Sequence, residues 1–203
     1  MSRRNLPKNK HSSNNTIRII GGEWRSRKLS FIDAEGLRPT PDRIRETLFN
    51  WLQGYIYGAN CLDLFAGTGV LGLEALSRGA SQVVFVEKNK AVAEQLEDNL
   101  ALLKAEAEVH HADALAFLNS SNIMQKWGGV LDIIFLDPPY RKGLLEKSLT
   151  ILCDQEKGFI NKNTLIYLEH EAEELFDWEM FGLKVLKGAD AGQVKSYLMR
   201  QDI

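Results

Sequence analysis

The chain has 203 residues, of which 44% are hydrophobic and 26% are charged, and its formal net charge is −2. This length suits one domain of ordinary size that buries most of its apolar surface. No apolar stretch approaches the roughly 20 residues that span a bilayer, and the start of the chain lacks the basic and then apolar pattern of a secretory leader. We therefore expect a cytoplasmic protein rather than a membrane or secreted one.

Cysteine and histidine usage predicts neither a disulfide nor a metal site. Cys61 falls in a predicted strand and Cys153 in a predicted helix, where reduced core thiols are more common than a bridge. The four histidines show none of the spacings that are typical of metal ligands. We expect no bound metal.

Charge is distributed unevenly along the chain. Residues 1–45 contain eleven lysines and arginines and four acidic residues, a net charge of +7, so the other 158 residues must carry −9. Such asymmetry predicts a polyanion-binding face that the N-terminus builds on a neutral-to-acidic body. Residues 1–15 are polar and basic, and we expect a flexible tail there that either contacts the polyanion or only keeps the chain soluble.

The first predicted elements are a hairpin and a helix. Strands at 18–20 and 27–31 flank Gly21-Gly22 and could pair. Thr40 is then predicted to cap a helix that has Pro41 at its first position and runs to about Leu52. These elements form an N-terminal unit over 16–58, which precedes a second unit over 59–203.

From residue 61 onward, predicted strands alternate with predicted helices. The strands cover 61–65, 82–87, 106–111, 130–136, 163–169, 183–187 and 194–200, and the helices cover 70–77, 89–103, 114–119 and 143–153. The last two strands are expected to join as a hairpin through 188–192. This order predicts an α/β, Rossmann-like fold with a seven-stranded mixed sheet covered by helices on both faces.

A glycine turn links the first strand of that sheet to its helix. Gly67 and Gly69 lie between the apolar strand and the helical pattern, an arrangement in which a nucleoside-like ligand lies against a helix N-terminus. Glu87 closes the next strand, twenty positions after Gly67, where its carboxylate can accept hydrogen bonds from ribose hydroxyls. Taken alone, the glycines also fit an ordinary tight turn.

The same turn satisfies the dinucleotide fingerprint Gly67-x-Gly69-x-x-Gly72, so a dehydrogenase must be considered. In the usual dinucleotide site the fingerprint opens the domain, whereas about sixty residues precede it here. Asp63 would repel a pyrophosphate but attract the ammonium or sulfonium group of S-adenosylmethionine. The alternative for Asp63 is a solvent-facing strand residue.

The sequence Asp137-Pro138-Pro139-Tyr140 follows a buried strand. Two consecutive prolines stop the strand and fix φ, so the turn is stiff and its carbonyls point in set directions. We expect the Asp137 carboxylate and the Pro138 carbonyl to accept hydrogen bonds from an amino group of a base, and Tyr140 to stack on that base. The four residues also fit an ordinary strand-ending turn with a surface tyrosine.

Together these motifs resemble a known class of enzyme, the class I S-adenosylmethionine-dependent methyltransferases of exocyclic amino groups; the resemblance rests on 63–72, Glu87, Asp113 and 137–140. Residues 17–29 and 38–52 are similar to the opening of the RsmD family, bacterial methyltransferases that act on the N2 amine of a guanine in small-subunit ribosomal RNA. Ser26 stands where glycine is common in that family. The resemblance implies a monomeric enzyme that methylates 16S ribosomal RNA in an assembled or partly assembled small subunit.

The residues and the resemblance together give three groups of site residues. The catalytic group is Asp137, Pro138, Pro139 and Tyr140. The group that binds S-adenosylmethionine is Arg38, Thr40, Asp63, Phe65, Ala66, Gly67, Gly69, Glu87, Lys88, Asp113, Ala114 and Asp137. The RNA-binding group is Arg18, Arg25, Arg27, Lys28, Arg43 and Arg141. Asp113 can accept a hydrogen bond from the adenine amine, cap the helix 114–119, or do both.

Two alternatives to this function stay open. Asp-Pro-Pro-Tyr suits adenine N6 and guanine N2 equally well, so a DNA or RNA adenine-N6 methyltransferase is the first alternative. The second is a non-catalytic nucleotide-binding or ribosome-assembly factor that keeps the pocket without turnover.

Overall fold

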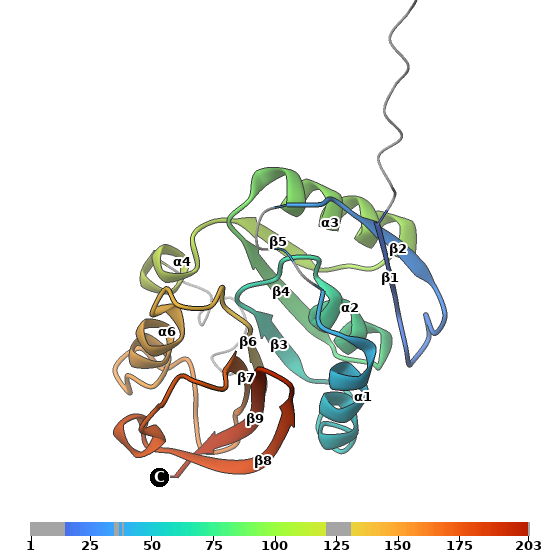
Figure 1. Ribbon diagram of the computed structural model, residues 1–203. Coiled ribbons are helices and arrows are strands. Elements are labelled where there is room, and N and C mark those ends of the chain that lie inside the picture. Colours follow the sequence, from blue (N-terminus) through green and yellow to red (C-terminus); the bar gives the residue numbers. More distant parts are fainter. Residues whose placement is uncertain (1–14, 35–36, 38, 121–130, 203) are drawn as a thin grey trace, which may run out of the picture.

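A seven-stranded mixed sheet forms the centre of the molecule, in the strand order β5-β4-β3-β6-β7-β9-β8 (Figure 1). The computed structural model describes residues 15–34, 37, 39–120 and 131–202. The strands are β3 (Asn60–Asp63), β4 (Gln82–Glu87), β5 (Glu108–His111), β6 (Ile133–Leu136), β7 (Leu165–Glu171), β8 (Leu183–Ala191) and β9 (Val194–Gln201). β3 pairs in parallel with both β4 and β6, and β9 runs antiparallel to β7 and β8. The predicted sheet is confirmed.

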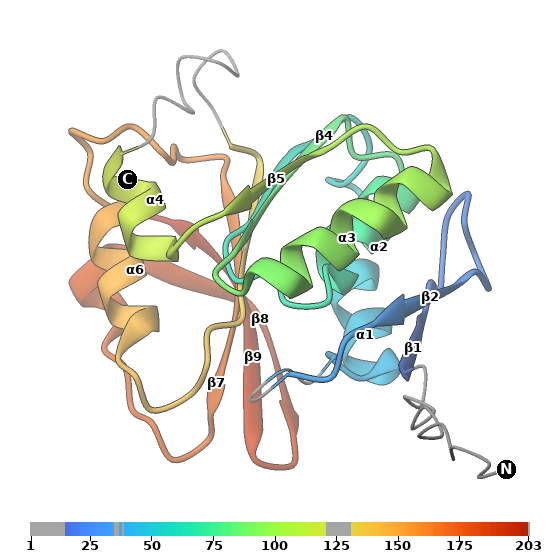
Figure 2. The same cartoon turned by 90° about the horizontal axis from the view of Figure 1, so that it is seen from above.

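Helices cover both faces of this sheet (Figure 2). One face carries α1 (Asp42–Trp51), α2 (Val70–Ser77) and α3 (Lys90–Leu103), and the other carries α4 (Ala114–Ser120) and α6 (Leu144–Leu152). A short helix, η1 (Trp178–Phe181), precedes β8. Each face has its own cluster of buried apolar side chains, so the sheet is buried on both sides, as its nearly continuous apolar strands require.

The N-terminal hairpin packs on the α3 face of the sheet. Its strands, β1 (Asn15–Arg18) and β2 (Lys28–Phe31), are antiparallel. Leu29 is buried in the same core cluster as residues of α1, α2 and α3, and the Asn99 amide of α3 donates a hydrogen bond to the Ser30 carbonyl at 2.9 Å. The segment predicted as a separate N-terminal unit therefore shares one core with the sheet.

Two local predictions are wrong. Thr40 does not cap α1: Pro41 occupies the N-cap position, and the Thr40 hydroxyl instead donates to Asp137 at 3.4 Å. The predicted hairpin between the last two strands forms, but its turn is shorter than 188–192, because β8 continues to Ala191 and pairs with β9 from Val194 onward. Gly188 lies against the Tyr197 ring, where a Cβ would come within 3.0 Å of a ring carbon, and this cross-strand cover stabilises a glycine in a strand.

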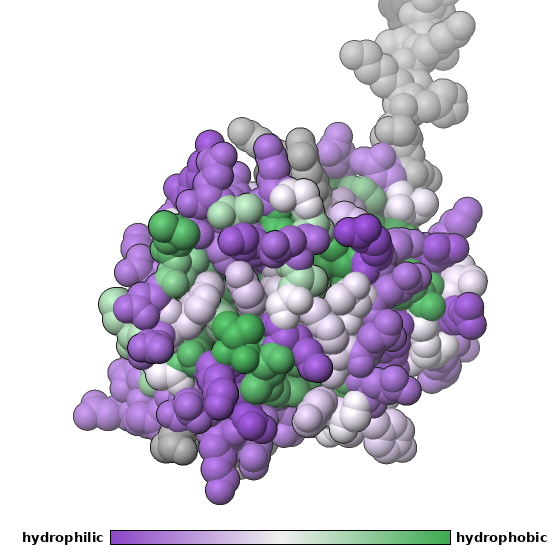
Figure 3. Space-filling view, turned by 60° about the horizontal axis from the view of Figure 1, so that its bottom comes forward, coloured by the Kyte–Doolittle hydropathy of each residue, from purple (hydrophilic) through white to green (hydrophobic). Residues whose placement is uncertain are grey.

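Other features of the described residues can be stated briefly. Both cysteines are free thiols, as predicted. Across the described ranges, no helix is long and apolar enough to cross a membrane, and no group of three or more histidine, cysteine or acidic side chains could hold a metal ion. Figure 3 shows one face of the molecule, on which hydrophilic side chains surround smaller hydrophobic clusters.

Candidate active site

The chemistry-bearing acids gather at one edge of the sheet. Asp63, Glu87 and Asp137 stand at or directly after the carboxyl ends of β3, β4 and β6, and Asp113 follows β5 by two residues. Because β3, β4, β5 and β6 are parallel, these ends meet at the same edge. β3 has neighbours that follow it by crossovers on both sides, which makes this edge the switch point where open α/β sheets bind ligands.

The glycine turn after β3 brings its backbone close to this edge. Gly67 has a φ of 51° and Gly69 a φ of 75°, both in the left-handed region that glycine adopts without strain. A Cβ on Gly69 would lie 2.4 Å from a Leu96 methyl carbon, and one on Gly67 would lie 2.8 Å from a Leu37 methyl carbon. The positive φ angles therefore favour glycine at both positions, and a side chain there would also have to move these leucine methyl groups.

Asp63 faces inward, so the alternative of a solvent-facing residue is wrong. Asp63 is only 3% exposed. Its carboxylate accepts a hydrogen bond at 3.0 Å from the amide of Gly72, which lies in the first turn of α2. Burial raises the pKa of Asp63 to about 7, against the effect of the Gly72 bond, and the negative charges of Asp137 and Glu87 raise it further. A cation beside this carboxyl would favour its ionised form.

Glu87 is tied to the glycine turn. Its carboxylate accepts hydrogen bonds from the Gly67 amide at 2.9 Å and from the Asn89 amide at 2.6 Å. A carboxylate has about four acceptor positions, so capacity remains for hydroxyl donors from a ligand. The predicted role toward ribose stays a prediction.

Asp113 and Lys88 form an exposed pair near the same edge. The Lys88 ammonium lies 3.0 Å from one Asp113 oxygen, and the other oxygen accepts from the amides of Leu115 and Ala116. The hydrogen bond from Lys88 lowers the pKa of Asp113 below its ordinary value. Asp113 therefore does cap α4, whose first residue is Ala114, and the role toward an adenine amine stays a prediction.

Asp137 stands at the start of the proline turn after β6. Burial raises the pKa of Asp137 to about 6, although the Thr40 hydrogen bond opposes this rise. Pro138 is buried, whereas Pro139 is exposed and Tyr140 is 37% exposed. Desolvation and then the charge of Asp137 raise the pKa of Tyr140, so its hydroxyl stays protonated.

A buried ionic cluster that the sequence motifs do not predict joins α1, α2 and the hairpin. Arg45 is buried and donates to the carbonyls of Thr40 at 3.1 Å and Arg18 at 2.9 Å, and it lies 3.3 Å from a carboxylate oxygen of the fully buried Glu74. Glu74 also accepts from Arg78 at 2.8 Å. The one available signal was Glu74 itself, a lone acid in the otherwise apolar helix Val70–Ser77.

The same cluster connects the hairpin to α2. The Ile20 amide donates to Glu74 at 2.9 Å, and the Trp24 amide donates to the Ser77 hydroxyl at 2.9 Å. Gly22 has a φ of 75°, and a Cβ there would lie 1.8 Å from the Ser77 carbonyl oxygen. The chain between β1 and β2 is therefore fitted closely against α2.

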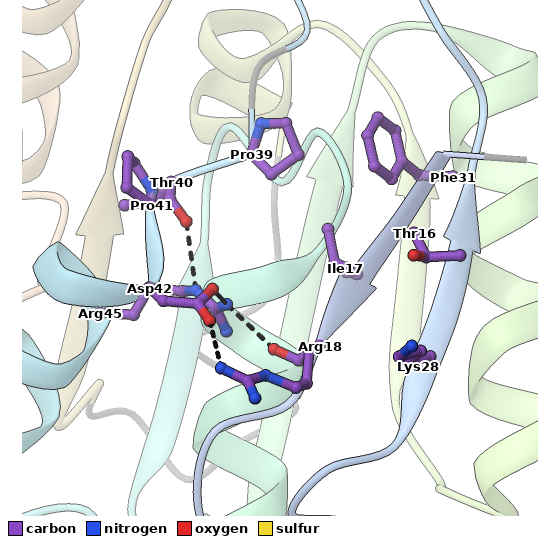
Figure 4. Close-up of a pocket in the computed structure, with 10 residues that line it drawn as sticks. All are labelled: Thr16, Ile17, Arg18, Lys28, Phe31, Pro39, Thr40, Pro41, Asp42 and Arg45. Atoms are coloured by element: carbon purple, nitrogen blue, oxygen red, sulfur yellow. Dashed lines mark hydrogen bonds and ion pairs between the residues drawn. The ribbon is translucent and has the colours of Figure 1, made fainter. Parts of the chain in front are cut away.

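A cavity of about 460 Å³ lies between the hairpin and the start of α1 (Figure 4). Its walls include Arg18, Lys28, Phe31, Thr40 and Arg45. Dashed lines in Figure 4 mark the hydrogen bond from Arg45 to the Thr40 carbonyl and the ion pair between Arg18 and Asp42. Cationic and aromatic side chains thus border a hollow next to the Thr40–Asp137 contact.

The candidate RNA-binding residues fall into two regions. Arg25, Arg27, Lys28 and Arg43 are exposed on the hairpin and α1, and Arg18 joins them there although it pairs with Asp42 at 2.8 Å. Arg141 lies apart from these, in the turn after β6, and pairs with Glu171 at 2.6 Å. Arg38, a candidate cofactor residue, and the predicted tail up to residue 14 lie outside the described residues, whereas Phe65 and Ala66 begin the glycine turn.

Comparisons with known proteins add a consistent set of relatives. The family model described as "Conserved hypothetical protein 95" matches residues 17–200. The chain is 46% identical over 203 residues to Ribosomal RNA small subunit methyltransferase D of Escherichia coli strain K12, covering 97% of this chain and 96% of that protein. It is 47% identical over 161 residues to the protein of the same name from Haemophilus influenzae, covering 78% and 80%.

Solved structures with the same architecture include yhhF from Escherichia coli, with a TM-score of 0.79 and 45% identity over 93% of this chain and 99% of that one. The Thermus thermophilus 16S rRNA N2 G1207 methyltransferase, solved with AdoMet and guanosine, has a TM-score of 0.66 and covers 93% of this chain and 50% of its own. At 19% identity, the second similarity extends to the fold alone.

Proposed function

Because the chain belongs to the Ribosomal RNA small subunit methyltransferase D family, we propose that it transfers a methyl group from S-adenosylmethionine to the N2 amine of a guanine in 16S ribosomal RNA. The observation that carries this proposal is the position of Asp137 and Pro138. They follow β6, beside the strand whose end carries Asp63 and the glycine turn. A base amine held by the proline turn would therefore lie next to a ligand held by the glycine turn.

The residues around the glycine turn fit S-adenosylmethionine. The buried Asp63 and the carboxylate of Glu87 would repel a pyrophosphate but suit a ligand with ammonium and sulfonium groups. The glycine turn leads directly into the N-terminus of α2, where a nucleoside-like ligand is proposed to lie. When bound, this ligand supplies an activated methyl group. Glu87 is proposed to hold the ribose and Asp113 the adenine amine.

The proline turn is proposed to activate the target amine. The lone pair of an aryl amine is delocalised into the ring, and hydrogen bonds from both N–H groups to fixed acceptors favour a pyramidal, more nucleophilic nitrogen. The acceptors are the Asp137 carboxylate and the Pro138 carbonyl, and Tyr140 would stack on the base. The amine loses its proton only after the new bond forms, so no strong base is required. A site without a catalytic histidine or cysteine is consistent with this chemistry.

The hairpin and α1 are proposed to carry the RNA toward this site. Five of the candidate cations lie there, and the 460 Å³ cavity between the hairpin and α1 falls within the usual size range of ligand pockets, roughly 300–1,000 Å³. A nucleotide beside the target could enter this cavity, with Arg18 and Lys28 near its phosphate. An assembled or partly assembled subunit is the proposed substrate. A monomeric state and a cytoplasmic location stay predictions.

Methyl transfer from tritiated S-adenosylmethionine to purified small subunits, naked 16S ribosomal RNA and DNA tests the proposal. We expect label in the small subunits, and N2-methylguanosine after nuclease digestion. Label in N6-methyladenosine would instead support the adenine methyltransferase. No label in any substrate, with intact S-adenosylmethionine binding, would support the non-catalytic factor.

Glu87→Ala is expected to weaken S-adenosylmethionine binding about ten- to hundredfold, because hydrogen bonds to a charged acceptor contribute about 1.5–3 kcal/mol. Calorimetric titration measures the change. The matched control is Glu94→Ala, which removes a carboxylate that is 61% exposed on α3 and pairs, among the described residues, with Lys90 at 3.6 Å. Unchanged affinity in the Glu87 variant would remove Glu87 from the cofactor site.

Replacing Arg25, Arg27 and Lys28 together by alanine is expected to weaken binding to small subunits without changing cofactor affinity. If each cation contacts one phosphate, the slope of log affinity against log salt flattens by about 2–3 units. A control variant replaces three exposed lysines on the α6 and β8 side of the molecule: Lys147, Lys157 and Lys184. A purely structural role for the hairpin cations predicts a lower melting temperature and an unchanged salt slope, and that result would contradict the proposal.

A further inference from the structure

A second buried acid stands next to Asp137. Glu169 lies on β7 and is 3% exposed. β6 and β7 are parallel, with Phe135 paired to Tyr167 and Leu136 paired to Leu168. The next residues in each strand direction are Asp137 and Glu169, so the two carboxyl groups leave neighbouring strands at the same level. Side chains alternate along strands, which places both on the face that Phe135 and Tyr167 occupy.

The proposed mechanism assigns no role to the Glu169 carboxyl. In the described part of the chain, its hydrogen-bond partner is the Tyr167 hydroxyl, which donates to Oε1 at 2.7 Å, and no lysine or arginine forms an ion pair with it. Burial raises the pKa of Glu169 well above its ordinary value, and the negative charge of Asp137 raises it further. Two carboxyl groups this close do not both ionise readily, and Glu169 is the more deeply buried of the two, so we assign the retained proton of the pair to Glu169.

Glu169 also borders the residues proposed to hold the base. It lines a cavity of about 20 Å³ together with Pro138, Tyr140 and His170. A volume of this size takes one water molecule and no base, so a base would reach Glu169 only if the partly exposed Tyr140 side chain turned aside and stacked on the face of that base. The Glu169 carboxyl therefore lies where it can contact a base that the proline turn binds.

The chemistry of a neutral carboxyl group matches one part of guanine. Next to its N2 amine, guanine presents the N1–H donor and then the O6 acceptor on the same edge. A protonated carboxyl has a carbonyl oxygen that accepts and a hydroxyl that donates, side by side. The two edges are complementary.

We propose that Glu169 is a specificity-determining residue that recognises the target guanine as a neutral acid, accepting a hydrogen bond from N1–H and donating one to O6. Asp137 and Pro138 hold the N2 amine at the same time. This inference rests on the proposed function. Recognition by Glu169 also explains a preference for guanine over adenine, which Asp-Pro-Pro-Tyr alone does not give. Adenine offers only an acceptor nitrogen beside its amine and a C–H beyond it. A neutral Glu169 makes two hydrogen bonds with guanine and one with adenine.

The test removes the recognised atoms from the substrate. Small subunits are assembled on 16S ribosomal RNA that carries either guanine or 2-aminopurine at the position that the wild-type protein methylates. 2-Aminopurine keeps the N2 amine but lacks O6 and the N1–H. The wild-type protein should transfer about tenfold or more faster to guanine than to 2-aminopurine, as expected for loss of hydrogen bonding in a buried site.

Variants of Glu169 then test whether this residue causes the difference in transfer rate between guanine and 2-aminopurine. Glu169→Ala should reduce the guanine to 2-aminopurine ratio to within about twofold of one, whereas Glu169→Gln should keep the wild-type ratio because an amide presents the same donor and acceptor as a neutral carboxyl. The control is Glu173→Ala, which removes a carboxylate that is 86% exposed beyond the end of β7. Melting temperatures identify any loss of folded protein, and the ratio does not depend on the amount that is folded.

Each outcome decides the inference. If Glu169→Ala slows both substrates equally and keeps the ratio, Glu169 is structural and the inference is overturned. If Glu169→Gln loses the ratio as alanine does, recognition by a neutral acid is overturned. Wild-type transfer to the guanine subunits tests the proposed function separately, and wild-type transfer only to an adenine would overturn both.

Discussion

Asp137→Ala should lower the rate constant of methyl transfer by about a hundred- to a thousandfold, the effect of removing one fixed acceptor or donor from the reacting group in other enzymes. Affinity for S-adenosylmethionine should change little, because the proposed partner of this carboxylate is the substrate amine. Single-turnover transfer to small subunits measures the rate, and calorimetry measures the affinity. A variant that methylates at the wild-type rate would contradict the mechanism.

The ionisation of Asp137 adds a pH dependence to this prediction. Its pKa is raised to about 6, so below that pH the carboxyl becomes protonated and can no longer accept from the amine as a carboxylate. We expect kcat/KM on small subunits to fall as the pH drops through about 6, and this step to be absent in Asp137→Asn. Asp63 and Glu169 also titrate above their ordinary range, and because the charge of Asp137 contributes to both shifts, their steps should remain in the asparagine variant but move to lower pH.

Asp137→Asn also controls for unfolding. The folded-state pKa of Asp137 is about 6 and lies above its ordinary value of 3.8, so its ionisation lowers stability as the pH rises from about 3.8 to about 6, and that loss remains at higher pH. A neutral amide avoids this cost. The melting temperature of Asp137→Asn at pH 7.5 should therefore equal or exceed that of the wild type, and a lower one would show that the activity loss includes misfolding.

Glu74→Ala should destabilise the protein by about 3–5 kcal/mol, because removing one partner of a buried ion pair leaves the other charge buried with fewer partners; Arg45 would keep its ion pair with Asp42, whose side chain is 46% exposed. Arg45 would lose its buried carboxylate, and the Ile20 amide would lose its acceptor. For a chain of 203 residues, this corresponds to a fall in melting temperature of roughly 6–20 °C. Calorimetry and denaturant unfolding measure the two quantities.

The matched control for Glu74 is again Glu94→Ala, since its exposed ion pair with Lys90 is worth about 1 kcal/mol or less. A Glu74 variant as stable as the Glu94 variant would mean that the cluster does not hold the hairpin to α2. Because Arg45 donates to the Thr40 carbonyl, we also expect Glu74→Ala to slow methyl transfer under conditions where the variant is folded.

The parts of the site that local pattern encodes could be predicted from the sequence. The glycine turn could be predicted from Gly67 and Gly69, because a short turn between a strand and a helix requires the positive φ angles that glycine adopts. The proline turn at Asp137 follows from two consecutive prolines after an apolar strand. The family, which the similarity of 17–29 and 38–52 indicated, is confirmed by relatives that match nearly the whole chain.

The parts of the site that depend on contacts between residues far apart in sequence could not be predicted. Thr40 has the side chain and position of a helix cap, but its hydroxyl bonds to Asp137, which is 97 residues away. Gly188 belongs to a strand because Tyr197 covers it from β9. The proximity of Glu169 to Asp137 is evident only when β7 is placed beside β6. Local propensity carries no information on these partners.

The bonds from Ile20 and Arg18 into the buried charges of α1 and α2 mean that the hairpin is not a detachable module. A hairpin transplanted from a distant relative would have to present a free amide and a free carbonyl at the same two places, or Glu74 and Arg45 would have to change with it. We expect proteases that cut between β2 and α1 to leave a nicked but undissociated molecule. The backbone of the hairpin and the buried charges of α1 and α2 can therefore change only together, through coordinated substitutions across all three segments.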